Sequence, residues 1–279
     1  MTLRDIQVRL LRAGIENAAE EARVLAAHFS GVSDALLRAQ PTAELADPDG
    51  ALERAVSQRE GHYPLQYLLG MWGFWRQEYE VSPDCLIPRS DTEMLLEYVV
   101  RHAPLGGRVL DLCTGSGCIA ISLLCERPDL SAVAVDLYEN TLDIAKRNAV
   151  RNGVGKDRLT FLRSDVLDGG FISSLGQFDM ILSNPPYIPA RVVDTLAPEL
   201  HYEPRAALDG GEDGLTFYRR MLAADYRAAL REGGSFAFEI GYDQADDVRT
   251  LAGKDNCEIL CDLGGRARVA IVTPAHTLE

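Results

Sequence analysis

The sequence VLDLCTGSG at residues 109–117 decides the fold of this chain. It begins with the pattern of a buried strand and continues as a glycine-rich turn, after which a helical stretch follows at Cys118–Glu126. Gly115 and Gly117 can adopt backbone dihedrals that are barred to other residues, so the backbone there can approach a ligand closely. A strand, a glycine turn and a helix in this order predict a ligand at the carboxyl end of the strand.

A carboxylate at the end of the next predicted strand indicates the kind of ligand. Asp136 follows Asp111 by 25 residues, and in this topology a carboxylate there can accept hydrogen bonds from both ribose hydroxyls of a nucleoside. A tight turn in any doubly wound protein would explain the glycines but not this spacing. Ala120 stands where a dinucleotide-binding turn would have its third glycine. The pattern therefore disfavours NAD and favours S-adenosylmethionine, which has no pyrophosphate.

The chain from Arg89 onward alternates between strand-like and helix-like segments. Helical stretches such as Asn140–Arg151 and Gly214–Leu230 lie between most of the predicted strands. This alternation predicts an α/β fold with a mostly parallel seven-stranded sheet and helices on both faces. The predicted strands are Val109–Leu112, Ala132–Asp136, Leu159–Leu162, Met180–Ser183, Phe236–Ile240, Glu258–Cys261 and Val269–Val272.

The first 70 residues contain only helical patterns. Apolar residues such as Ile6 and Leu10 recur at helical spacing with polar residues between them. The segment Trp72–Ile87 is instead rich in aromatic and extended-favouring residues, which predicts a short hairpin. We therefore predict a helical domain at residues 1–70, a hairpin linker at 71–88 and a ligand-binding domain at 89–279.

Composition argues against several classes of protein. With 42 acidic and 28 basic residues the net charge is −14, which opposes non-specific attraction to nucleic acid. No apolar run approaches the ~18 residues that cross a bilayer, and the N-terminus lacks a signal-peptide segment. We therefore expect a cytoplasmic protein with no membrane partner and no direct nucleic-acid partner. The six cysteines form no Cys-x-x-Cys pair and lack zinc-ligand spacing to histidine, so we expect neither metal nor disulfides.

The second motif is Asn184-Pro185-Pro186-Tyr187, directly after the predicted strand at residues 180–183. Its two prolines fix both φ angles and remove two backbone donors, which makes a rigid wall. The Pro185 carbonyl and the Asn184 side-chain oxygen offer two neighbouring acceptors, which match the two donors of a planar NH₂ group. Tyr187 adds an aromatic face on which a planar group can stack. The motif predicts a site for an amide or amino nitrogen.

These two motifs resemble those of class I S-adenosylmethionine-dependent methyltransferases that modify a glutamine amide or an adenine amino group. Further strings, in order along residues 60 to 270, resemble the HemK/PrmC family of release factor glutamine methyltransferases. They are Pro64–Gly70, Ile87–Glu93, Glu203–Leu208, Gly210–Leu215, Glu239–Gly241 and Asp262–Arg266. The resemblance implies a Rossmann-like methyltransferase fold with an N-terminal helical domain that grips the substrate protein.

The resemblance also implies a reaction and a site. A methyl group would pass from S-adenosylmethionine to the glutamine amide of the Gly-Gly-Gln motif in class I peptide chain release factors, leaving S-adenosylhomocysteine. Asn184, Pro185 and Tyr187 would be catalytic, and the substrate would also contact Pro186 and Arg89. The residues implied to bind the cofactor are Asp111, Cys113, Thr114, Gly115, Ser116, Gly117, Asp136, Asp165, Val166 and Asn184. Asp136 would hold the ribose, and Asp165 and Val166 would flank the adenine; we expect a monomer.

Other interpretations stay open. Cys113 stands where most release-factor enzymes have glycine, and residues 111–118 look more like the sister enzyme that methylates a glutamine of a large-subunit ribosomal protein. A nucleic-acid adenine methyltransferase would need a basic cleft. A non-catalytic nucleoside-binding module would not need Asn184. Ser90 and Glu93 also fit a capping box at a helix start, which by itself would explain that segment.

Overall fold

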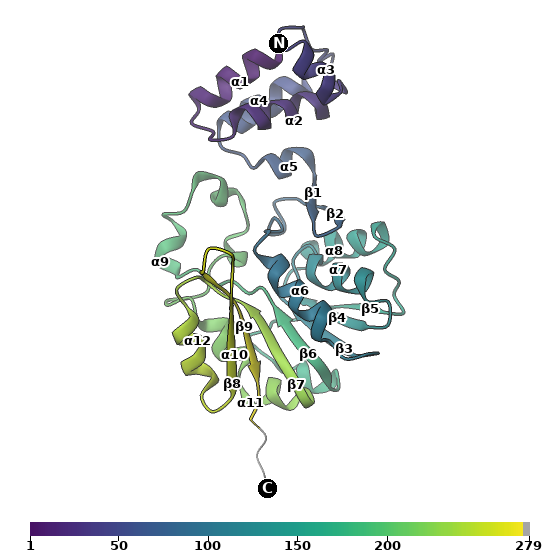
Figure 1. Ribbon diagram of the computed structural model, residues 1–279, viewed down its shortest axis with the longest axis vertical. Coiled ribbons are helices and arrows are strands. Elements are labelled where there is room, and N and C mark those ends of the chain that lie inside the picture. Colours follow the sequence, from purple (N-terminus) through teal and green to yellow (C-terminus); the bar gives the residue numbers. More distant parts are fainter. Residues whose placement is uncertain (276–279) are drawn as a thin grey trace. The chain divides into compact units, whose positions relative to one another are not determined.

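A computed structural model describes residues 1–275, which divide into two compact units (Figure 1). Unit 1 consists of Met1–Met71 together with Ala197–Tyr202, a segment from the second half of the sequence. Unit 2 consists of Trp72–Leu196 and the residues from Glu203 on. Within residues 1–275, no helix is both long and apolar enough to cross a membrane.

Unit 1 consists of short helices around an apolar core. Its first helix begins with a capping box, in which the Thr2 hydroxyl accepts the Asp5 N–H and the Asp5 carboxylate accepts the Thr2 N–H. Ile6 and Leu10 are fully buried, so the periodic apolar residues form the core of this unit. The helices are α1 (Leu3–Arg12), α2 (Ala18–Ser30), α3 (Asp34–Ala39), α4 (Ala51–Glu60) and α5 (Leu65–Leu69).

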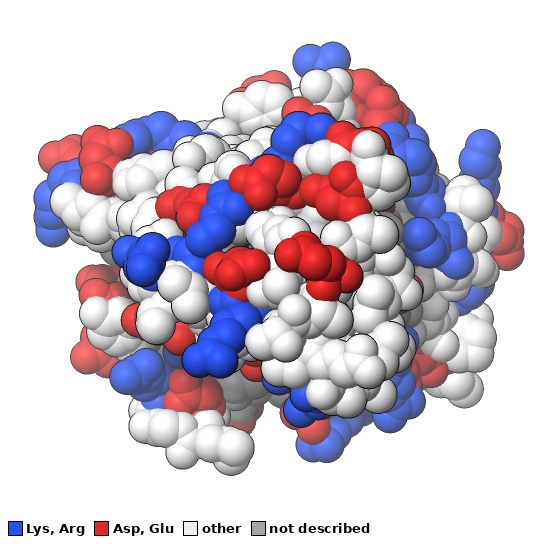
Figure 2. Space-filling view, turned by 90° about the horizontal axis from the view of Figure 1, so that it is seen from above, with Lys and Arg blue, Asp and Glu red and all other residues white. Residues whose placement is uncertain are grey.

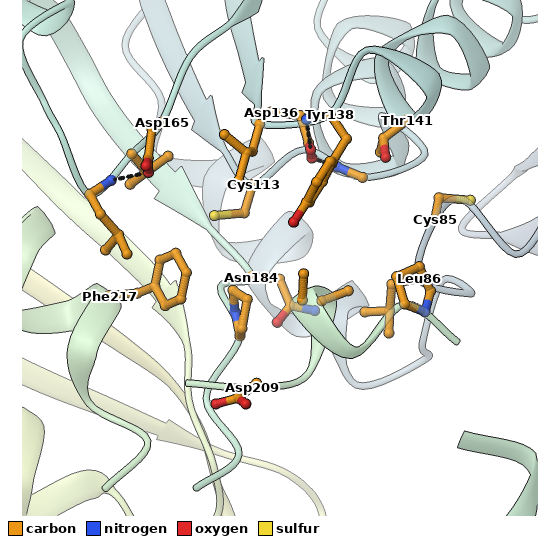
Figure 3. Close-up of a pocket in the computed structure, with 18 of the residues that line it drawn as sticks. Cys85, Leu86, Cys113, Asp136, Tyr138, Thr141, Asp165, Asn184, Asp209 and Phe217 are labelled. Atoms are coloured by element: carbon orange, nitrogen blue, oxygen red, sulfur yellow. Dashed lines mark hydrogen bonds between the residues drawn. The ribbon is translucent and has the colours of Figure 1, made fainter. Parts of the chain in front are cut away.

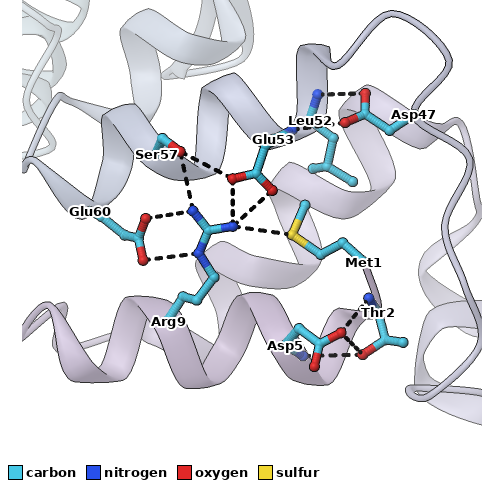
Figure 4. A network of polar contacts seen from close by, with 9 residues as sticks. All are labelled: Met1, Thr2, Asp5, Arg9, Asp47, Leu52, Glu53, Ser57 and Glu60. Atoms are coloured by element: carbon cyan, nitrogen blue, oxygen red, sulfur yellow. Dashed lines mark hydrogen bonds and ion pairs between the residues drawn. The ribbon is translucent and has the colours of Figure 1, made fainter.

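Arg9 ties α1 to α4 through two carboxylates (Figure 4). Its Nε and Nη2 donate to Glu60 at 3.0 and 2.6 Å, and its Nη1 donates to both oxygens of Glu53 at 2.8 and 2.9 Å. The bonds to Arg9 hold the pKa of Glu60 below its ordinary value. Charge-assisted, two-pronged contacts of this kind fix the relative positions of the two helices.

A two-stranded hairpin, β1 (Met71–Phe74) and β2 (Gln77–Glu80), follows the helices at the predicted place. Trp75 lies in its turn with a left-handed φ of 57°. The Trp75 backbone N–H donates to Glu93 at 2.8 Å, and the indole N–H donates to Glu126 at 3.0 Å. These bonds attach the turn to α6 (Thr92–His102) and α7 (Cys118–Glu126).

The sheet of unit 2 has the strand order β5-β4-β3-β6-β7-β9-β8, which confirms the predicted mostly parallel, seven-stranded α/β fold. β3 pairs in parallel with β4 and β6, whereas β9 is antiparallel to β7 and β8. The strand order reverses beside β3, which is where ligands bind in such sheets. The strands are β3 (Arg108–Leu112), β4 (Ser131–Asp136), β5 (Leu159–Arg163), β6 (Phe178–Ser183), β7 (Leu230–Glu239), β8 (Asn256–Cys261) and β9 (Ala267–Thr273).

Two apolar cores cover the two faces of this sheet. Leu96 of α6 and Ile119 of α7 belong to one core, and Tyr218 of α10 (Thr216–Met221) and Val248 of α12 (Ala245–Ala252) belong to the other. Helices on both faces shield the central strands from water, as a parallel sheet requires. The remaining elements are α8 (Glu139–Arg151), α9 (Ala190–Val193), α10 (Thr216–Met221), α11 (Ala224–Ala228), α12 (Ala245–Ala252), η1 (Ile172–Ser174), η2 (Pro198–Tyr202) and η3 (Arg205–Ala207).

The helical stretch predicted over Gly214–Leu230 is wrong in its continuity and at its C-terminal end. The chain forms α10 and α11 instead, because Ala223 between them is extended with a ψ of 166°. The Leu222 carbonyl accepts a bond from Arg227 Nε at 2.6 Å, which satisfies a backbone acceptor at the break. Leu230 already belongs to β7.

The capping box predicted at Ser90 and Glu93 is also wrong. α6 begins at Thr92 after Asp91, whose side chain makes no capping hydrogen bond. The Glu93 carboxylate accepts the Trp75 N–H of the hairpin turn instead. The Glu93 carboxylate, which the local pattern assigned to capping the helix, therefore serves a tertiary contact with the hairpin turn.

We expect Phe236→Ala to destabilise the protein by about 3–5 kcal/mol, because truncation of a fully buried aromatic ring leaves a cavity. Phe236 has no exposed surface, and its ring lies 5.5 Å from that of Phe238. Urea unfolding followed by circular dichroism measures the change. Tyr242→Ala, at a position that is 67% exposed, is the control and should change the free energy of unfolding little.

Candidate active site

The pairing of β3 with β6 places the two sequence motifs side by side. Leu112 is the register partner of Ser183, so Cys113 and Asn184 follow at neighbouring carboxyl ends. The Ser183 hydroxyl donates to the Leu112 carbonyl at 2.7 Å, which locks the two strand ends together. The glycine turn and the Asn-Pro-Pro-Tyr motif therefore border one crevice.

The glycine turn is held from beneath by buried polar side chains. The Thr114 hydroxyl donates to Asp111 Oδ2 at 2.6 Å, and burial raises the pKa of Asp111 to about 7. Gly117 has a φ of 82°, a left-handed conformation that strains residues with a side chain, so glycine is favoured there. Cys113 also has a left-handed φ, of 59°. The turn thus has a fixed shape before any ligand arrives.

A cavity of about 340 Å³ opens above this turn, within the size range of small-molecule sites (Figure 3). All its lining residues belong to unit 2. In Figure 3 the Cys113 side chain points between Asp165, Phe217 and Asn184. The predicted site residues that line the cavity are Cys113, Gly115, Asp136, Asp165, Val166, Asn184 and Pro186.

The other predicted residues lie outside the lining. Asp111 lies in β3, and Thr114, Ser116 and Gly117 belong to the turn; all four are buried. Pro185 is buried beside the cavity, and the Tyr187 hydroxyl points to Glu239 at 3.3 Å. Arg89 forms an ion pair with the buried Glu203, whose other oxygen accepts the Ile87 N–H at 3.0 Å. This pair joins the segment before α6 to the segment before η3.

Asp136 is oriented by two backbone donors. Its Oδ2 accepts the Gly115 N–H at 3.0 Å, and its Oδ1 accepts the Tyr138 N–H at 3.2 Å. The residue is 9% exposed, and this burial raises the pKa of its carboxyl group. The carboxylate therefore joins β4 to the glycine turn, and its remaining lone pairs are available to a ligand at the cavity wall.

The charge of the cavity suits S-adenosylmethionine. Asp84, Asp136, Asp165 and Asp209 line it, and the lining residues in the described part of the chain include no lysine, arginine or histidine. A phosphate-bearing cofactor would meet like charges there, whereas a sulfonium and an ammonium would meet opposite ones. Leu86, Leu137, Val166, Leu167 and Phe217 add apolar surface for a purine ring.

The Asn-Pro-Pro-Tyr motif is held by a second set of buried polar groups. Asn184 Nδ2 donates to the Thr92 hydroxyl at 3.0 Å. Burial raises the pKa of Glu239, the partner of Tyr187, to about 7. The buried Gln244 donates to the Tyr187 carbonyl at 2.9 Å. The motif is therefore fixed at both ends.

Sequence reasoning missed much of the cavity wall. Leu137 and Tyr138 directly follow Asp136, and Pro204 to Gly211 overlap strings that matched the family, so the sequence did carry a signal for them. Asp84 to Leu86 and Phe217 carry no such signal, because only the fold brings them to the strand ends. The missed lining residues are Asp84, Cys85, Leu86, Leu137, Tyr138, Thr141, Leu167, Pro204, Ala206, Ala207, Asp209, Gly211, Thr216 and Phe217.

Neither disulfides nor metal-binding groups are found in the described part of the chain. None of the six cysteines, all of which the structure describes, forms a disulfide. Among residues 1–275 no group of at least three His, Cys, Asp or Glu side chains could hold a metal ion.

Two family models match the chain, one to each part of the sequence. The model described as "PrmC N-terminal domain" matches residues 2–70, and "Methyltransferase small domain" matches residues 90–234. The solved structure of SMU.776 complexed with S-adenosylhomocysteine has a TM-score of 0.51 at 12% identity, covering 71% of this chain and 53% of that chain. At that identity the likeness shows a shared fold.

Curated relatives match nearly the whole chain. It is 36% identical over 272 residues to "Release factor glutamine methyltransferase" of Caulobacter vibrioides, covering 94% of this chain and 92% of that protein. It is 40% identical over 276 residues to the protein of the same name from Cereibacter sphaeroides, covering 96% and 95%. With both family models matched and this identity sustained over more than nine tenths of each relative, the chain belongs to the release factor glutamine methyltransferase family.

Proposed function

We propose that this protein transfers a methyl group from S-adenosylmethionine to the side-chain amide nitrogen of the glutamine in the Gly-Gly-Gln motif of class I peptide chain release factors. The observation that carries the proposal is the place of Asn184, which directly follows β6 at the wall of a cavity suited to the cofactor. Family membership supports the choice of glutamine and of release factors as substrate.

The cofactor would be held by the glycine turn and the three strand ends beside it. Asp136 would accept the ribose hydroxyls, and Asp165 with Val166 would flank the adenine, near Phe217. Gly115 has open space where a side chain would stand, so the ligand can lie against its backbone. When bound, S-adenosylmethionine supplies an electrophilic methyl group attached to its positively charged sulfur. The leaving group is S-adenosylhomocysteine, a neutral thioether.

The substrate amide would be held by two acceptors. An amide nitrogen is a poor nucleophile because its lone pair is delocalised into the carbonyl. Asn184 Oδ1 and the Pro185 carbonyl would each accept one of its N–H groups, which favours a more pyramidal nitrogen with its lone pair toward the methyl carbon. These oxygens would also stabilise the positive charge that develops on nitrogen. Positioning of the reacting atoms then supplies much of the rate.

The proposed reaction needs no strong general base. Once the new N–C bond has formed, the nitrogen carries an extra proton that is acidic, and it can leave to water. No histidine or lysine lines the cavity in residues 1–275, which agrees with this route. The residues of this chain therefore act by binding, orienting and stabilising charge.

The alternative substrate, a glutamine of a large-subunit ribosomal protein, is favoured by residues 111–118. The departure that matters there is Cys113, which stands where most release-factor enzymes have glycine. Its φ of 59° gives another reason for glycine at this position in relatives, since glycine adopts that conformation without strain. The identity of residue 113 is therefore tied to backbone conformation more than to the choice of substrate. Nucleic acid is disfavoured by the acidic cavity, and on the face drawn in Figure 2 basic side chains are interspersed with acidic ones.

The experiment that tests the proposal is peptide mass spectrometry of a purified, unmethylated release factor after incubation with this protein and S-adenosylmethionine. We expect one added methyl group on the Gly-Gly-Gln glutamine. The ribosomal protein, incubated in parallel, should remain unmodified. Methylation of the ribosomal protein alone would overturn the choice of substrate.

Asn184→Ala should lower kcat by about 100-fold or more, because it removes one of the two acceptors for the developing charge. Affinity for the cofactor, measured by calorimetry, should change little. Asn256→Ala, on the exposed part of the edge strand β8, is the matched control and should leave turnover intact. Near-normal turnover in Asn184→Ala would refute the assigned role.

Asp136→Ala should weaken S-adenosylmethionine binding by about 10- to 100-fold, the loss expected for charged hydrogen bonds to a ligand. Because burial raises the pKa of Asp136, this carboxylate becomes protonated at a higher pH than an exposed aspartate does. Affinity for the cofactor should therefore fall as the pH drops through that range, because the protonated carboxyl group is a weaker acceptor. Calorimetric titrations across pH check both effects. Asp246→Ala, at a 96% exposed side chain, is the control.

A further inference from the structure

A continuous chain of hydrogen bonds lies behind Asn184. Asn184 Nδ2 donates to Thr92 Oγ1 at 3.0 Å, and Thr92 Oγ1 donates to Glu239 Oε2 at 2.5 Å. The other carboxylate oxygen, Oε1, accepts the Tyr187 hydroxyl at 3.3 Å. Thr92 and Glu239 are each only 2% exposed, so bulk water does not compete for these bonds. The chain joins the first and last residues of the motif through side chains from α6 and β7.

Donor and acceptor chemistry sets the direction of this chain. An ionised carboxylate only accepts, so Thr92 and Tyr187 both give it their hydroxyl protons. The Thr92 oxygen can then only accept from Asn184, which must turn its nitrogen toward Thr92 and its Oδ1 away. We propose that Thr92 and Glu239 are positioning residues that set which end of the Asn184 amide faces the substrate. This inference rests on the proposed function, since it concerns how Asn184 receives the substrate amide.

The end of the amide that faces the substrate decides whether the target nitrogen can be held. The oxygen and nitrogen ends of asparagine have nearly the same shape, so packing does not distinguish them. When Asn184 Oδ1 faces the substrate, it can accept a hydrogen bond from the substrate N–H. When Asn184 Nδ2 faces the substrate, two donors face each other and no hydrogen bond forms. In a buried site, a fully satisfied hydrogen-bond network is the means that selects one orientation.

The network contains a group whose charge changes near neutral pH. Burial raises the pKa of Glu239 to about 7. A protonated Glu239 can donate to Thr92, which frees the Thr92 proton to turn toward Asn184 and reverse its amide. Transfer should therefore rise with pH through the pKa of Glu239 and decline below it. The groups that face Glu239 are the carboxylate of Asp91, the guanidinium of Arg268, the phenols of Tyr187 and Tyr218, the hydroxyl of Thr92 and the thiol of Cys118.

Paired substitutions at Thr92 separate positioning from packing. Thr92→Val keeps the shape but removes the hydroxyl, and we expect kcat at saturating cofactor and release factor to fall about 10- to 100-fold, as for an unmet buried hydrogen bond. Thr92→Ser keeps the hydroxyl and should restore most of kcat. Wild-type kcat in Thr92→Val, or equal losses in both variants, would overturn the inference.

Ser122→Ala is the matched control for a lost buried hydroxyl. Ser122 has no exposed surface, and its Oγ lies 2.5 Å from the Tyr79 hydroxyl, outside the cavity lining. The control should lower Tm without lowering kcat. A kcat loss in this control equal to that of Thr92→Val would mean that kcat follows stability, and the inference would fail.

Glu239→Gln tests the pH dependence, because glutamine keeps the shape and does not ionise. In the wild type and in Ser122→Ala, kcat should rise with pH around the Glu239 pKa of about 7. In Glu239→Gln this rise should disappear. If the variant keeps the same rise, another group titrates and the proposed role of Glu239 is wrong.

A measurement on the amide itself separates this inference from the proposed function. With asparagine nitrogen isotopically labelled, the Asn184 side-chain signal, identified by its loss in Asn184→Asp, should shift with pH in the wild type and not in Glu239→Gln. This NMR readout needs no methyl acceptor. A shift without release factor methylation would overturn the proposed function alone, and methylation without a shift would overturn the inference alone.

Discussion

The parallel pairing of β3 with β6 is the constraint on which the site depends. Backbone hydrogen bonds align Leu112 with Ser183, so the chain leaves both strands at the same edge of the sheet. A slip of one residue would turn each side chain to the opposite face and remove the apolar partners of both cores. The register that buries the core is therefore the same register that brings Cys113 and Asn184 together.

Both motif loops are supported in the same way, by a buried carboxylate that accepts a threonine hydroxyl. Asp111 accepts from Thr114 at 2.6 Å beneath the glycine turn, and Glu239 accepts from Thr92 at 2.5 Å behind Asn184. Burial raises the pKa of each carboxyl group to about 7. Such groups are costly to bury unless they are hydrogen-bonded, so their bonds give the loops one strongly preferred geometry.

Acidic and basic side chains serve different roles in this chain. The cavity gathers carboxylates and apolar side chains, which suits a cationic nucleoside cofactor. Arginines form ion pairs elsewhere, as Arg9 does in unit 1 and as Arg89 does with Glu203 in unit 2. Arg89 shows how a residue that matches a family motif can serve the fold, since its partner holds the Ile87 backbone as well.

The sequence by itself determined the sheet, the edge of it that carries the cavity, and the two motifs, because strand periodicity, glycine turns and the Asn-Pro-Pro-Tyr string are local patterns. Only the tertiary structure decided which carboxylates and hydroxyls support those motifs. Glu93, which fits a helix cap locally, instead holds the Trp75 backbone, and Thr92 meets Glu239 from 147 positions away. Hydrogen-bond partners over such separations depend on how helices pack on the sheet, and no local pattern records that packing.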